Sequence, residues 1–275
     1  MIYDIGIVDT KKVIAAIKET YNIDFSNFAL TAFKRRLLYV LNENNYASIV
    51  DFISNIENNQ LLFEKYLSQG LVDTTEMFRD PSSWREIRDQ HLPDLYKNRE
   101  FKVLVPGLTS GDDLYTLLIM LKEAGMLHHA KVTATSISEI RLKNVELGGY
   151  YDLKKMEIGE ANYRRFSDDA SLSAYYTLEG TKARMNRDLL ENVTFKKYSF
   201  LVDEALKGFH LVIYRNRLIF FNPTLQDKVT EKLIKSTLLG GFISTGSKES
   251  LANTPYFTKL TCLNQEEKLY KKRTE

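Results

Sequence analysis

The first 70 residues carry apolar side chains at the spacing of helix turns. Ala29, Phe33, Leu37 and Leu41 follow one another at intervals of four, which places them on one face of a helix that Ser26 could cap. Comparable stripes occur around residues 13–17, 49–56 and 62–67. No proline interrupts this part of the sequence. The pattern therefore predicts an all-helical N-terminal domain over residues 1–70.

After residue 100 the pattern changes to short apolar runs that alternate with helical stripes. The runs lie at 102–105, 131–135, 209–214 and 242–245, and the stripes at about 113–123, 139–147 and 223–239. Gly240 and Gly241 are expected to end the last stripe. Such alternation is typical of the α/β class, with a parallel sheet covered by helices. We therefore predict a second domain over residues 101–275.

Three segments fall outside this alternation. Residues 71–100 form a linker, in which Asp80 followed by Pro81 is typical of a helix start. Short strand-like runs on either side of Gly180, the last of them at 193–195, predict a small β insertion at about 163–200. The mostly charged residues 265–275 are expected to form a solvated tail or a terminal helix.

The composition is that of an ordinary globular protein, with 44% hydrophobic and 27% charged residues among 275. The single cysteine, Cys262, allows neither an intrachain disulfide nor a zinc site built on thiolates, and it favours the reducing cytoplasm. No signal peptide or membrane span is evident, so we expect no membrane insertion. The net charge of +2 is too small to indicate nucleic acid. We expect a cytoplasmic monomer.

The glycine-containing loop at 106–111 is the first candidate for chemistry. A glycine-rich turn after a parallel strand brings backbone amides close to a ligand, beside the N-terminus of a helix. No lysine follows the second glycine, so the loop is not of the Walker A type and nucleotide triphosphate hydrolysis is disfavoured. By itself the loop is equally typical of an ordinary strand-to-helix turn.

Polar residues elsewhere offer three further candidates. Arg79 lies between the two domains, where a guanidinium could clamp a carboxylate. Arg215 and Asn216 follow a predicted strand, at the edge where open α/β sheets bind ligands. The three cations at 34–36 cannot all face the apolar stripe. Each of these groups is also consistent with a solvated cap, loop or helix face. The four histidines show no metal-ligand spacing, and we expect no metal site.

Five motifs, in order, resemble those of the chemotaxis receptor glutamate methyltransferases of the CheR type. DTTEMFR at 73–79 is similar to the family's NETxFFR, and GLTSGDDLYT at 107–116 is similar to GxSTGEEPYS. ATSIS at 134–138 resembles ATDID, and YRNRLIFF at 214–221 resembles CRNVLIYF. GGFISTGSKESL at 240–251 resembles GGYLxxGxSESL. The resemblance extends over nearly the whole chain, including the helical N-terminal part.

The resemblance implies a Rossmann-like domain that uses S-adenosylmethionine (SAM) to methylate glutamates of a chemotaxis-type receptor, leaving S-adenosylhomocysteine (SAH). Thr75 and Arg79 would contact the amino-acid end of SAM, with Arg79 at the reacting centre, and Asp112 or Asp113 would lie near its charged groups. The implied cofactor pocket also includes Asp73, Gly107, Gly111, Ser136, Arg215 and Asn216. The basic helix carrying Lys34, Arg35 and Arg36 would bind the receptor.

Three positions depart from the family pattern. Ser136 replaces an aspartate that would accept hydrogen bonds from the ribose, Asp73 replaces an asparagine, and Phe220 replaces the active-site tyrosine. A charge-assisted hydrogen bond is worth about 1.5–3 kcal/mol against about 1 kcal/mol for a neutral one, so loss of the aspartate would weaken cofactor binding about tenfold or more.

These departures leave three hypotheses. The first is an active receptor carboxylate methyltransferase. The second is a catalytically weak or inactive relative that binds receptors or other signalling proteins. The third is a methyltransferase acting on another substrate, such as a small molecule. The insertion shows no long glycine-containing loop of the kind that family members use to bind a receptor's C-terminal peptide, so we expect no dependence on such a tether.

Overall fold

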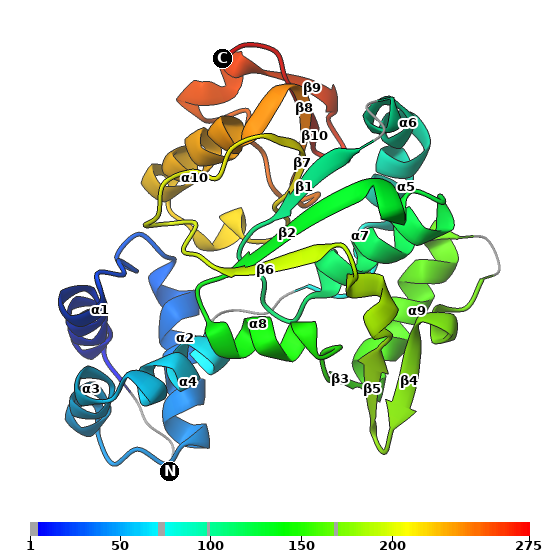
Figure 1. Ribbon diagram of the computed structural model, residues 1–275. Coiled ribbons are helices and arrows are strands. Elements are labelled where there is room, and N and C mark those ends of the chain that lie inside the picture. The colour runs from blue at the N-terminus through cyan, green and yellow to red at the C-terminus, as the bar shows by residue number, and fades with distance from the viewer. Residues whose placement is uncertain (1–4, 71–74, 98–99, 168–169) are drawn as a thin grey trace.

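The computed structural model describes residues 5–70, 75–97, 100–167 and 170–275. Figure 1 shows a group of helices near the N-terminus beside a larger α/β part. The four helices are α1 (Ile7–Tyr21), α2 (Leu30–Glu43), α3 (Ile49–Asn58) and α4 (Gln60–Gly70). They enclose an apolar core of their own that includes Val13, Ile17, Leu37, Leu41 and Phe52. The helical N-terminal part predicted from the stripe pattern is confirmed.

Helix α2 begins later than the sequence pattern indicated. Its N-cap is Ala29, whereas Ser26 lies in the preceding turn, where its amide donates to Asp24 Oδ1 at 2.8 Å. The Ala29 amide donates to the carbonyl of Phe220 at 2.7 Å. The predicted cap by Ser26 is therefore wrong. At this helix start the acceptor is a backbone carbonyl from the second part of the chain, and no side chain caps the helix.

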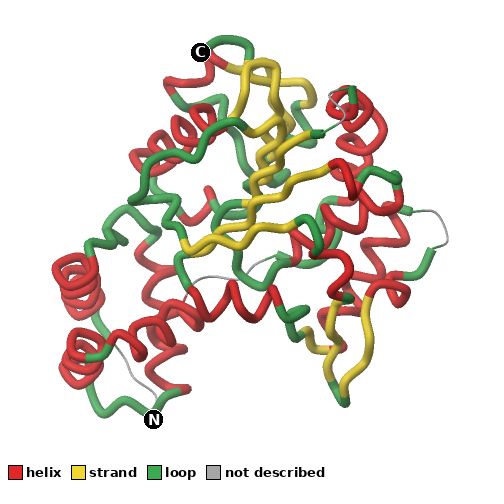
Figure 2. The backbone as a smooth tube through the Cα atoms, viewed as in Figure 1, coloured by secondary structure: helices red, strands yellow, loops and turns green. Residues whose placement is uncertain are grey.

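The α/β part is built on a seven-stranded sheet with the order β6-β2-β1-β7-β8-β10-β9. Its strands are β1 (Phe101–Val105), β2 (Ala130–Ser136), β6 (Val193–Lys197), β7 (Phe209–Ile213), β8 (Thr237–Ser244), β9 (Leu260–Asn264) and β10 (Leu269–Lys272). The first five strands of the order are parallel, and β10 runs antiparallel to both β8 and β9. Figure 2 shows these strands running through the middle of this part with helices around them.

Helices cover both faces of the sheet, and the strands are apolar on both faces accordingly. The helices are α5 (Pro81–Glu86), the π-helix Ile87–His91, α6 (Leu92–Tyr96), α7 (Asp112–Glu123), α8 (Glu139–Glu146), α9 (Leu153–Phe166) and α10 (Pro223–Ser236). Val103 and Leu211 share one core with α7, whereas Leu104 and Val212 share a second core with α10. Short 3-10 turns occupy Leu127–His129, Leu172–Tyr175, Arg187–Leu190, Leu218–Phe220 and Pro255–Lys259.

The predicted β insertion is present, with different limits. Strands β3 (Tyr151–Asp152), β4 (Tyr176–Glu179) and β5 (Lys182–Met185) form an antiparallel sheet, and only Gly180 and Thr181 separate β4 from β5. Residues 163–166 belong to α9. Residues 193–197, expected in the insertion, form β6 and pair with β2 of the main sheet. A five-residue run does not specify its partner strand, which is why the pattern misplaced it.

Three expectations about helix and chain ends also needed correction. The stripe expected to run to 239 ends at Ser236, and Gly240 and Gly241 lie inside β8. The segment treated as a linker contains α5 and α6, and Trp84 of α5 is fully buried. The charged C-terminal segment contains β10, in which Leu269 and Tyr270 are buried. Two buried apolar side chains are enough for β10 to form a strand, because β8 and β9 pair with its backbone on both sides.

Candidate functional site

The strand order of the main sheet reverses between β1 and β7. In open α/β sheets, ligands bind in the crevice outside the carboxyl ends of the strands at such a point. A pocket lies there, between the loops that follow β1, β2, β6 and β7 and the helical N-terminal part. Its lining residues are Phe25, Phe28, Gly107, Leu108, Thr109, Ser136, Ile137, Tyr198, Ser199, Phe200, Leu201, Tyr214, Arg217, Phe220 and Phe221.

Aromatic side chains make up much of the pocket wall. Phe28 from the N-terminal part stacks edge-on against Phe221, with 4.9 Å between the ring centroids. The segment before α2 is held there by an isolated β-bridge between these two residues and by the Asn222 amide, which donates to the carbonyl of Asn27 at 2.9 Å. Motif matching missed the wall residues Phe25 and Phe28, because no periodicity or motif marks residues that only domain packing brings to a pocket.

The glycine loop lies at the floor of this crevice, at the carboxyl end of β1. Gly107 and Gly111 have φ values of 73° and 91°, in the left-handed region that favours glycine. The Leu108 amide donates to the Thr135 carbonyl at 2.6 Å, which fixes the loop against β2. Gly111 is the N-cap of α7, so the loop leads directly into a helix N-terminus. The predicted juxtaposition of loop, strand end and helix start is present.

The two carboxylates at the start of α7 have different surroundings. Asp112 is fully buried and accepts from Lys155 Nζ at 3.0 Å and from the Ser110 hydroxyl. Asp113 accepts from Thr75 Oγ1 at 3.3 Å, and its Oδ2 lies 3.7 Å from Arg217 NH2. Lys155 already neutralises Asp112, whereas Asp113 contacts a side chain that lines the pocket. Asp113 is therefore the better candidate for the carboxylate near a cationic ligand.

Ser136 ends β2 and is fully buried in the pocket wall. Its hydroxyl donates to the Leu108 carbonyl at 2.9 Å and accepts from the Ser138 amide at 3.3 Å. These bonds join the end of β2 to the glycine loop. Ser136 therefore supports the local backbone where a family aspartate would accept hydrogen bonds from a ligand.

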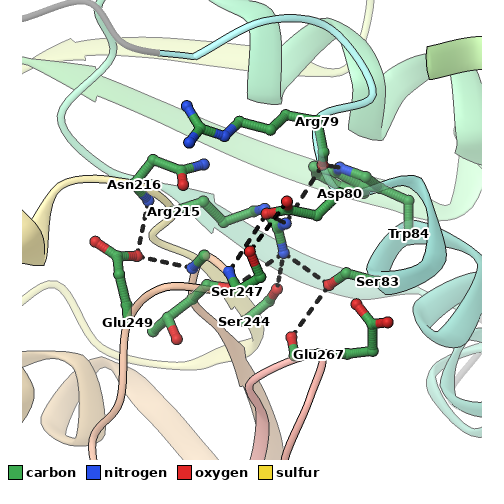
Figure 3. Close-up of polar contacts among 12 residues, drawn as sticks. Arg79, Asp80, Ser83, Trp84, Arg215, Asn216, Ser244, Ser247, Glu249 and Glu267 are labelled. Carbon is green, nitrogen blue, oxygen red and sulfur yellow. Dashed lines mark hydrogen bonds and ion pairs between the residues drawn. The ribbon is translucent and has the colours of Figure 1, made fainter.

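Arg215 lies in an internal network rather than in the pocket lining (Figure 3). Its side chain has 0% exposure, and it pairs with Asp80 Oδ2 at 2.9 Å. It also donates to Ser83 Oγ at 2.7 Å and to Ser244 Oγ at 2.9 Å. The Thr245 carbonyl accepts a further bond at 3.1 Å. Arg215 thus connects the start of α5 with the end of β8.

Asn216 has a left-handed backbone with φ 57°, held by a buried carboxylate that motif matching did not assign to the site. Glu249 accepts from the amides of Asn216 and Gly246, each at 2.7 Å (Figure 3). Burial raises the pKa of Glu249 above its ordinary value, against the opposing effect of these backbone hydrogen bonds. The position of Glu249 in the motif at 240–251 was the available signal. Glu249 fixes the loops after β7 and β8 to each other.

Neither Thr75 nor Arg79, which belong to the NETxFFR-like segment, is among the residues that line the pocket. Thr75 is buried beside Asp113. The carbonyl of Arg79 accepts from Trp84 Nε1 at 3.0 Å, while its side chain extends away from the Arg215 network and over Asn216 in the view of Figure 3. The prediction for Asp73 falls outside the described residues.

Phe220 lies in the pocket wall, as the motif match placed it. The phenylalanine supplies no hydroxyl at this position. A phenol is present in the same wall at Tyr214, whose full burial raises its pKa well above the ordinary value and keeps it protonated.

The three cations of α2 do not share one environment. Arg35 is exposed, and Lys34 is half-buried. Arg36 is also half-buried, donates to the Gln69 carbonyl and lies over the Tyr39 ring, 4.7 Å from its centroid. Arg36 therefore links α2 to α4, and Arg35 is the cation most available to a partner.

Over the ranges that the structure describes, no group of three or more potential ligands is placed to hold a metal ion, and no helix is long and apolar enough to cross a membrane. The strand order, the glycine loop and the mainly apolar crevice define a Rossmann-like α/β domain with a ligand site at the carboxyl ends of its strands. A likeness of fold alone extends to the N-methyltransferase NodS of Bradyrhizobium japonicum in complex with SAH, at 11% identity and a TM-score of 0.36 over 70% of this chain and 87% of that one.

Sequence comparison identifies the family. The model of the CheR methyltransferase SAM-binding domain matches residues 73–265. Cher3 of Pseudomonas putida is 29% identical over 265 residues, which cover 96% of this chain and 97% of that protein. A chemotaxis protein methyltransferase of Listeria innocua is 24% identical over 239 residues, covering 86% and 88% of the two chains. The chain belongs to the CheR methyltransferase family, and its cofactor is SAM.

The residues of the crevice fit this cofactor. The aromatic walls suit a planar base, and the left-handed glycines let the loop backbone approach a ligand closely. The expected carboxylate for the ribose is absent, since Ser136 stands there.

Proposed function

We propose that this protein transfers a methyl group from SAM to glutamate side chains of a chemotaxis-type receptor. The observation that carries the proposal is the pocket at the reversal of strand order, which is lined in part by the segments that carry the CheR-like motifs at 107–116, 134–138 and 214–221. The related proteins named chemotaxis protein methyltransferases support the choice of a receptor as the acceptor.

When bound, SAM supplies an activated methyl group on a positively charged sulfur. A glutamate carboxylate is ionised near neutral pH and needs no general base to act as the nucleophile. The residues of the pocket therefore have to align the acceptor and exclude water, a task that aromatic walls such as Phe28 and Phe221 can perform. Phe220 is compatible with this chemistry, because no proton has to be moved by a side chain at its position.

Replacing Ser136 with aspartate is expected to tighten SAM binding about tenfold, because a charge-assisted hydrogen bond replaces a neutral one. Calorimetric titration of SAM into the wild type and Ser136→Asp measures the change. Ser136→Asn is the matched control, since it has the shape of the aspartate without its charge, and it should not tighten binding. Absence of SAM binding by the wild type at millimolar cofactor would contradict the proposal.

Charge reversal on α2 tests the receptor side of the proposal. Arg35→Glu should weaken association with a receptor cytoplasmic fragment about fivefold at low salt, and less at high salt, because exposed ion pairs are weak and screened. Lys11→Glu, an equally exposed change on α1, is the control. Unchanged affinity of Arg35→Glu at low salt would show that α2 is not the docking surface.

A receptor-binding module with weak or no activity is the second candidate function. Ser136, Asp73 and Phe220 favour it, because all three depart from the family pattern: the resemblance implies a ribose-binding carboxylate at the first position, an asparagine at the second and an active-site hydroxyl at the third. The tight β4–β5 turn, with only Gly180 and Thr181, supports docking without a peptide tether for either candidate.

A further inference from the structure

Arg217 follows β7 and extends across the crevice to the glycine loop after β1. Its NH1 donates to the Pro106 carbonyl at 2.6 Å. Its guanidinium carbon lies 5.4 Å from the centroid of the Tyr214 ring. Its side chain passes over Gly107, where an added Cβ would be 3.8 Å from Arg217 Cδ, Nε and NH1. Arg217 therefore spans the point at which the strand order reverses.

Arg217 is the one charged side chain among the described residues that line this pocket. The rest of the lining is apolar, aromatic, or contributed by small polar residues. An anionic group entering such a site loses hydration and is stable there only when it is paired with a cation and hydrogen-bonded. An anionic group of a ligand is therefore expected to bind in this pocket beside Arg217.

The guanidinium has capacity for such a group. A guanidinium carries five N–H donors in a planar fork that matches a carboxylate. In the described part of the chain, Arg217 makes one hydrogen bond, to Pro106, and its contact with Asp113 Oδ2 is long at 3.7 Å. Donors therefore remain for a ligand, and the cation is not fully neutralised by Asp113.

We propose that Arg217 binds the carboxylate of the methyl acceptor and orients it in the crevice. The inference rests on the proposed function and adds the residue that recognises the acceptor. One carboxylate oxygen is held by the guanidinium. The second forms the bond to the methyl carbon as the bond between that carbon and the sulfonium sulfur breaks, and the electron pair of the broken bond stays on the sulfur of SAH. The ester product is neutral, so it loses the ionic part of this interaction, which favours its release.

The test compares an anionic with a neutral acceptor analogue and does not require turnover. N-acetylglutamate methylamide and N-acetylglutamine methylamide are titrated into the protein saturated with SAH, and binding is followed by NMR. The wild type should prefer the anion about tenfold. Arg217→Met should abolish that preference, and Arg217→Lys should retain part of it. Arg164→Met, which removes an exposed cation on α9, should leave it unchanged.

Two outcomes would overturn the proposal. In the first, the wild type binds neither analogue at millimolar concentration or binds both equally well. In the second, Arg217→Met keeps the preference for the anionic analogue. Tighter SAH binding by Arg217→Met with an unchanged preference would instead show that the side chain merely obstructs the cofactor. Preference for the anion together with no methyl transfer to any receptor fragment would refute the proposed function and leave Arg217 as a carboxylate-binding residue.

Discussion

Replacement of Arg215 with methionine should lower the free energy of unfolding by about 3–5 kcal/mol, the usual cost of breaking a buried ion pair by removing one partner. Arg215 is fully enclosed, and its loss leaves the Asp80 carboxylate without its cation and Ser83 and Ser244 without their donor. Urea unfolding followed by circular dichroism measures the change. Because Arg215 directly follows Tyr214 and is two residues before Arg217, both of which line the crevice, SAM affinity should fall as well.

Two variants separate this effect from a general loss of charge. Arg273→Met removes an exposed arginine, which donates to the Thr258 carbonyl, and should change stability little. The double variant Arg215→Met, Asp80→Asn should recover part of the loss, since no uncompensated charge remains. A decrease of less than about 1 kcal/mol in Arg215→Met, the range of exposed pairs, would contradict the buried network.

Substitution of Gly111 by alanine is the second change with a large expected effect, of about 2–5 kcal/mol on stability. The left-handed φ of 91° costs about 1–2 kcal/mol for a residue with a Cβ. The new Cβ would also lie 2.8 Å from Val145 Cγ1, and such overpacking costs about 1–3 kcal/mol. Relief of the clash must move α8 or the start of α7, so SAM affinity should decrease too.

Gly125→Ala is the matched control for Gly111→Ala. Gly125 also has a positive φ, of 68°, but an added Cβ would meet no atom within 4 Å. Its variant should therefore show the backbone cost alone and unaltered SAM binding. Equal destabilisation by the two substitutions, with SAM affinity retained in both, would show that the glycine loop is not held as tightly as the structure indicates.

Periodic segments were predictable from the sequence because periodicity reports burial directly. The stripe on α2 and the runs of β1 and β7 form cores in the structure as expected. Prediction failed where another part of the chain supplies the partner. β6 joins the main sheet through β2, and the charged segment that contains Tyr270 becomes β10 through β8 and β9.

The site residues divide in the same way, into those that the local sequence could predict and those that depend on a distant part of the chain. The motifs singled out Gly107 and Ser136, and both line the crevice because each lies at or just after the carboxyl end of a parallel strand. They could not show that Arg215 is an internal ion-pair partner, since that depends on Asp80 from a distant segment. Phe28 was equally hidden, because its place in the wall follows from the packing of the N-terminal helices on the loop after β7.

The central claim, methyl transfer to a receptor carboxylate, is tested most directly by incubating the protein with methyl-labelled SAM and the cytoplasmic fragment of a chemotaxis receptor. A methyl ester of glutamate is hydrolysed by base, so the account predicts label in the receptor fragment that is released as methanol at alkaline pH. Label should not appear when the receptor's glutamates at the modified positions are replaced by alanine. SAM binding and receptor binding without any base-labile label would contradict the claim and leave the receptor-binding module as the function.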